Sequence, residues 1–103
     1  MSIADEASAA LSAAKKWADE ANATARAGTI AGRPGQLVAG LSAWQWVEQA
    51  EQAARRAGTY AYAAAGAASA HDIPEAKRRL ANARSEAGSA QACARHTAEA
   101  VHG

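Results

Sequence analysis

Residues 39–67 read AGLSAWQWVEQAEQAARRAGTYAYAAAGA and carry the longest unbroken periodicity in the chain. Small or aromatic residues recur there in alternating steps of four and three: Ala39, Ala43, Trp46, Ala50, Ala53, Ala57, Tyr60, Ala64 and Ala67. This heptad spacing is typical of a helix that packs along one seam. Because the seam stays in phase across Gly58 and Gly66, it predicts one continuous helix over about residues 36–70.

Two further seams flank this one. The first predicts a helix over about residues 3–27, with Gly28 as its C-cap glycine, and comprises Ile3, Ala7, Ala10, Ala14, Trp17 and Ala21. The other predicts a helix over about residues 73–101, and comprises Ile73, Ala76, Leu80, Ala83, Ala87, Ala90, Ala94, Thr97 and Val101. Asp72 and Glu75 resemble a capping box at its start.

The connections between these segments are short. Residues 28–36 hold three glycines and one proline, which marks a loop, and Pro34 is suited to the first turn of the next helix. Short connections make neighbouring helices antiparallel. We therefore expect an all-α, up-down-up bundle of three long antiparallel helices, about 3–27, 36–70 and 73–101, in a single domain over residues 1–103.

The composition excludes several classes of protein. Thirty-four of the 103 residues are alanine, whereas Leu, Ile and Val together number ten and Phe is absent. Strands favour β-branched and aromatic residues, so a β fold is disfavoured. No stretch of about 18 residues lacks charge, which argues against a membrane span. One cysteine, Cys93, cannot form a disulfide within the chain.

The charge is nearly balanced. Eleven basic and ten acidic residues give a formal charge of +1, whereas nucleic-acid-binding domains usually carry a basic stripe. We therefore expect no nucleic-acid partner and no membrane partner. The acidic start of the chain is unlike a secretory signal, so a cytoplasmic location is expected. The bias toward Ala, Arg and Gly indicates a GC-rich, bacterial genome.

One apolar stripe lies off the seams. If residues 36–70 are helical, Leu37, Leu41 and Trp44 project away from the seam, whereas Trp17, Trp46 and Tyr60 lie on their seams and are expected in the core. Four alternatives explain the stripe: a flatter layer of helices with this helix in the middle, burial beneath the 28–36 loop and its Ile30, self-association, or contact with another protein. Apolar patches rimmed by polar residues mark interaction sites. The candidate partner-binding residues are Leu37, Leu41, Trp44, Glu48 and Arg55, and a homodimer is expected.

The residues with chemical potential do not converge. Cys93, His96 and Glu99 follow one flank of the third segment, but two or three ligands on one helix do not complete a metal site. A convex helix also offers no pocket for nucleophilic catalysis. The 28–36 loop lacks the Gly-Lys-Ser/Thr ending of a phosphate loop. We therefore expect no metal, no cofactor and no catalytic residue.

Two resemblances are limited to layout and composition. Chain length, alanine content and tryptophans beyond a first helix resemble the helical hairpins of type VII secretion, whose Trp-x-Gly turn is replaced here by Ala43-Trp44-Gln45-Trp46. The segments Ala57-Gly58 and Ala70-His71 resemble the helices of alanine-rich bacterial immunity proteins. Neither resemblance assigns a functional residue.

Together these observations favour a non-enzymatic helical protein-binding module, such as a small bacterial or phage inhibitor, immunity or adaptor protein. A self-assembling or secreted structural protein is the first alternative. The second is a small enzyme or ligand-binding protein whose site forms at an oligomer interface, for example from Glu48, Tyr62, His71 and His96.

Overall fold

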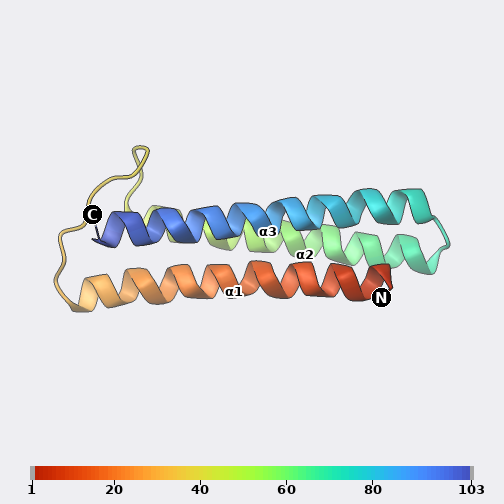
Figure 1. The fold of residues 1–103 in the computed structure, drawn as a ribbon, viewed down its shortest axis with the longest axis horizontal. Helices are drawn as coiled ribbons and strands as arrows, with labels where there is room; N and C mark the ends of the chain where they lie inside the picture. The colour runs from red at the N-terminus through yellow and green to blue at the C-terminus, as the bar shows by residue number, and fades with distance from the viewer. Residues whose placement is uncertain (1, 103) are drawn as a thin grey trace.

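The computed structural model describes residues 2–102 and contains three antiparallel helices (Figure 1). They are α1 (Ile3–Ile30), α2 (Ala43–Ser69) and α3 (Ile73–His102). The bundle measures 52 × 21 × 16 Å, and its radius of gyration is 15.6 Å, compared with about 13 Å for a typical domain of 100 residues. The predicted all-α, up-down-up bundle is confirmed, and it is a rod rather than a sphere.

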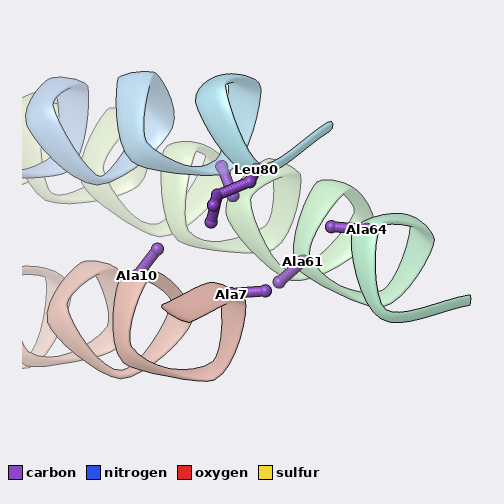
Figure 2. Packing of buried hydrophobic residues seen from close by; sticks show 6 residues of the cluster. Ala7, Ala10, Ala61, Ala64 and Leu80 are labelled. Carbon is purple, nitrogen blue, oxygen red and sulfur yellow. The ribbon is translucent and has the colours of Figure 1, made fainter. Parts of the chain in front are cut away.

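The core is built almost entirely of methyl groups. The buried apolar residues are alanines apart from Val47, Leu80 and Val101. Near the α2–α3 turn, Leu80 reaches from α3 into the space between the helices, where Ala7 and Ala10 of α1 approach Ala61 and Ala64 of α2 (Figure 2). Small side chains let helix axes approach closely, and this approach leaves little room for large side chains in the centre.

The aromatic residues of the seams lie at the edges of this core. Trp17 and Tyr60 are half-buried and pack against the alanine clusters. Trp46 is also half-buried, with its ring 4.4 Å from that of His96 between centroids. The expectation that these side chains belong to the core is therefore correct only in part, because all three are partly buried.

The end of α1 differs from the prediction. Gly28 is not a C-cap, because it lies inside the helix and is buried there against Val101. The helix ends instead at a Schellman motif with Gly32 in the left-handed conformation, in which the Gly32 N–H donates to the Thr29 carbonyl and the Arg33 N–H to the Gly28 carbonyl. The helix thus runs one turn beyond residue 27.

The start of α2 is the largest error of the sequence-based prediction. The helix begins at Ala43 and not near residue 36, so Pro34 and Ala39 lie in the loop. Ser42 and Gln45 form a reciprocal capping box, in which each side chain accepts a hydrogen bond from the other residue's backbone N–H. A Ser-x-x-Gln spacing is a known signal of helix initiation, and it outweighs the heptad phase of Ala39.

The turn between α2 and α3 is a second Schellman motif. His71 occupies the left-handed position with φ 62°, and the N–H groups of His71 and Asp72 donate to the carbonyls of Ala68 and Ala67. Asp72 then caps α3, since its carboxylate accepts the Glu75 N–H at 3.3 Å. The predicted cap at Asp72 is confirmed, but the reciprocal half of the capping box is absent, because the Glu75 carboxylate accepts from Arg78 and Arg79 and the Asp72 N–H donates to the Ala67 carbonyl. Among residues 2–102, no helix is both long enough and apolar enough to cross a membrane.

Candidate functional site

A groove of about 330 Å³ opens at the end of the bundle where the 31–42 loop crosses the C-terminal ends of α1 and α3. Figure 1 shows this loop projecting beside the end of α3. Two large apolar side chains, Leu37 and Trp44, line the groove and are 67% and 47% exposed. Most of the other lining residues are small; the full set comprises Ala25, Gly28, Thr29, Arg33, Pro34, Gly35, Gln36, Ser42, Ala43, Ala100 and Val101.

Hydrogen bonds, rather than apolar burial, hold the loop against the bundle. The Gln36 N–H donates to the Ala100 carbonyl of α3 at 2.8 Å, and the Trp46 indole N–H donates to the Val38 carbonyl at 2.9 Å. Gly35 has a φ of +66°, and a Cβ there would lie 3.0 Å from the Ala100 oxygen. These contacts fix the backbone on both sides of Leu37 while leaving its side chain in solvent.

A two-residue turn follows Leu37 in the loop. Val38 and Leu41 exchange both backbone hydrogen bonds, at 2.9 and 3.0 Å. Ala39 and Gly40 between them have positive φ, as a type I′ turn requires. The turn makes Leu41 half-buried and leaves it outside the groove lining. Leu37 and Leu41 therefore do not continue a stripe on α2, because both precede that helix.

Trp44 is the one apolar member of the expected stripe that lies on α2. Its indole N–H donates to the Thr29 hydroxyl of α1 at 3.1 Å, and that hydroxyl donates to the Ala25 carbonyl at 3.1 Å. The ring is thereby held across the gap between the two helices with half of its surface open. Ile30 does not cover it, since Ile30 is 81% exposed, and burial beneath Ile30 is ruled out for this stripe.

The two charged candidates lie farther along α2. Glu48 is exposed one turn beyond Trp44. Arg55 pairs with Glu51 at 3.8 Å and lines a different hollow, between α1 and α2. The five candidate residues thus divide into a groove pair, Leu37 and Trp44, and residues that lie outside the groove. The hydrogen-bonded loop that separates them was not predicted from the sequence, because the Gln36 and Trp46 contacts that hold it follow no local pattern.

On the flank of α3 that holds Cys93, His96 and Glu99, only His96 and Glu99 lie close together. The Glu99 carboxylate lies 3.6 Å from His96 Nδ1, whereas Cys93 is half-buried and burial raises the pKa of its thiol. A protonated thiol is a poor nucleophile and a poor metal ligand. Within residues 2–102, no three His, Cys, Asp or Glu side chains gather as metal ligands would.

The cations of α3 alternate with carboxylates. Glu75 holds both Arg78 and Arg79, Arg84 pairs with Glu6 of α1, and Arg56 of α2 pairs with Glu86. These contacts give α3 a face of mixed charge. A mixed face lacks the basic stripe on which non-specific nucleic-acid binding depends.

No family model, no curated protein and no solved structure matches this chain.

Proposed function

We propose that this chain is a protein-binding module that receives an apolar side chain of its partner in the groove between Leu37 and Trp44. Small inhibitors, immunity proteins and adaptors act in this way. The observation that carries the proposal is the position of Leu37, which is 67% exposed in a loop whose backbone is fixed on both sides. A fixed loop gains nothing for its own stability from an exposed leucine.

The geometry is suited to binding with little reorganisation. Loops that are ordered before binding lose less conformational entropy when the complex forms. The groove combines an aromatic wall with small residues and backbone, and partly exposed tryptophans are common at the centres of protein interfaces. Its volume of about 330 Å³ is near the lower end of ligand pockets, about 300–1,000 Å³, and it contains no convergent set of catalytic groups. An anchoring side chain of a partner fits these features.

The test compares Leu37→Asp with Ile73→Ser. Both positions hold exposed aliphatic residues, but Ile73 lies at the opposite end of the bundle. Immobilised wild-type and variant chains are exposed to a lysate of the source cells, the retained proteins are identified, and the binary Kd is then measured with purified partner. We expect Leu37→Asp to weaken binding at least tenfold and Ile73→Ser to leave it unchanged.

Two outcomes contradict the proposal. One is a purified partner that binds wild type and Leu37→Asp equally well. The other is a wild-type chain that retains no protein beyond those retained by Leu37→Asp. Circular dichroism of each variant shows whether the bundle is intact, and a folded Leu37→Asp is expected because its side chain points into solvent.

A further inference from the structure

The face formed by α1 and α2 is hollowed along its length. One hollow, of about 410 Å³, has a floor of small or half-buried residues at Leu11, Ala18, Ala54 and Gly58. Its rim carries the charged side chains Lys15, Asp19, Glu51 and Arg55. Asp19, Glu51 and Ala18 also line a second hollow that continues toward Ile30 at the end of α1. Together the hollows extend over residues 11–30, or about 28 Å of helix.

The positive and negative rim charges lie at different heights along the bundle axis, and each height is called a level here. Lys15 and Arg55 form a basic level, and Asp19 and Glu51 form an acidic level one helical turn away. On α1 the midpoint between the two charges is Trp17, and on α2 it is Ala53. Trp17 and Ala53 pack in the same cluster and therefore lie at the same height in the bundle. A two-fold axis through that height exchanges the basic level with the acidic level.

We propose that this face binds a second copy of the chain, with each α1 antiparallel to the other α1 and each α2 antiparallel to the other α2. Each of the four charges around the first hollow then meets an opposite charge. Lys15 faces Asp19 of the second copy, and Arg55, which lies 3.8 Å from Glu51 of its own chain, faces Glu51 of the second copy. The interface is isologous, as a two-fold dimer requires. A parallel dimer would instead place Lys15 against Arg55 and Asp19 against Glu51, which like-charge repulsion opposes.

The same two-fold arrangement also pairs side chains that carry no charge. Trp44 and Tyr62 are equally distant from Ala53, so each Tyr62 faces Trp44 of the second copy. Tyr62 is 85% exposed in the single chain. On α1, Leu11 faces Ala23 of the second copy, and Ala23 lines the second hollow. Aromatic and aliphatic side chains thus meet around the central charges.

The size of this face indicates a reversible dimer. The span from Trp44 to Tyr62 is about 27 Å, and two neighbouring helices present a width of about 20 Å. The two copies together would bury on the order of 1,000 Å², which is near the lower limit of specific interfaces. We therefore expect association that depends on concentration and that weakens as salt screens the paired charges.

Sedimentation velocity over a concentration series tests the proposal. We expect wild type to form a dimer and Arg55→Glu to raise the dimer dissociation constant at least tenfold, since it places Glu against Glu51. The double variant Glu51→Arg/Arg55→Glu exchanges the two charges in both copies, so dimerisation should return to within about threefold of wild type. Arg95→Glu is the matched control, because Arg95 is an exposed arginine on α3, outside this face.

Several results would overturn the proposal. A wild-type chain that stays monomeric at every concentration would do so, as would a dimer that Arg55→Glu leaves intact or that the double variant fails to restore. A dimer broken by Leu37→Asp but not by Arg55→Glu would place self-association at the groove. Leu37 and Arg55 line different hollows, so their variants measure partner binding and dimerisation separately. Trp44 borders the groove and also faces Tyr62 of the second copy, and it is left unchanged in both experiments.

Discussion

Two glycine-to-alanine substitutions in this bundle should have opposite effects. Gly28 and Gly66 both lie within helices, where alanine is favoured over glycine by about 1 kcal/mol. A Cβ at Gly66 meets nothing within 4 Å, whereas a Cβ at Gly28 lies 2.8 Å from Cγ1 and 3.2 Å from Cγ2 of Val101. Val101 is β-branched and has one favoured rotamer in a helix, so it cannot turn away from the new methyl group.

The magnitudes follow from these distances. Gly66→Ala should stabilise the chain by about 1 kcal/mol, which raises the Tm by about 4–8 °C in a domain of this size. Gly28→Ala gains the same propensity but overpacks the contact, at a cost of about 1–3 kcal/mol. Its net effect is therefore destabilising by up to about 2 kcal/mol. The difference between the unfolding free energies of the two variants measures the packing of α3 against α1 at the floor of the groove.

Thermal and urea unfolding, followed by circular dichroism, give both free energies. Val101→Ala in the Gly28→Ala background removes the clashing methyl groups and should recover part of the packing loss, which a double-mutant cycle measures as a favourable coupling. The reasoning is refuted if Gly28→Ala raises the Tm as much as Gly66→Ala does, or if the cycle shows no coupling between positions 28 and 101.

Three further predictions concern the turn, an ion pair and the thiol. His71→Gly should raise stability by about 1 kcal/mol, because His71 holds a left-handed conformation that glycine adopts freely; an unchanged or lower Tm would contradict this. Hydrogen bonds from Arg79 and Arg78 hold the pKa of Glu75 below its usual value. The resulting stability is present above the pKa of the unfolded chain and is lost as the pH falls through the folded pKa. Glu75→Gln should therefore flatten the fall in stability from about pH 5 downward, and an identical acid limb in both proteins would argue against the pairing. Burial raises the pKa of the Cys93 thiol, so iodoacetamide should alkylate native protein much more slowly than unfolded protein, and equal rates would show an accessible thiolate.

The sequence predicted the helices best where alanine spacing alone decides the outcome. The seam alanines of α2 from Ala50 to Ala64 are buried as expected, and the helix continues through Gly58. The start of α2 was misplaced because Ala39 falls in phase by chance, in a chain where one residue in three is alanine. The local capping signal of Ser42 and Gln45 carries the correct boundary, and it does not depend on composition.

The candidate site could be predicted only in part. Trp44 was identified because it lies off the seam, and it does line the groove. The groove itself depends on tertiary contacts that no local pattern reveals, such as the Gln36 N–H to the Ala100 carbonyl, 64 residues away along the chain. The error at Gly28 has the same origin, because only the approach of Val101 explains a glycine inside α1.

An alanine core also changes how an exposed aromatic residue should be interpreted. In a bundle with bulky seams, a half-exposed tryptophan is evidence of a missing partner. Here small seam residues leave little room for an indole between the helices, and Trp17 and Trp46 are only partly buried although both lie on their seams. The 47% exposure of Trp44 is therefore weak evidence by itself. Leu37 is stronger evidence, because its loop is not subject to the spacing of the helices and could turn a leucine inward. The outward position of Leu37 is what the Leu37→Asp experiment tests, and a Trp44 variant alone would not separate partner binding from packing on Thr29.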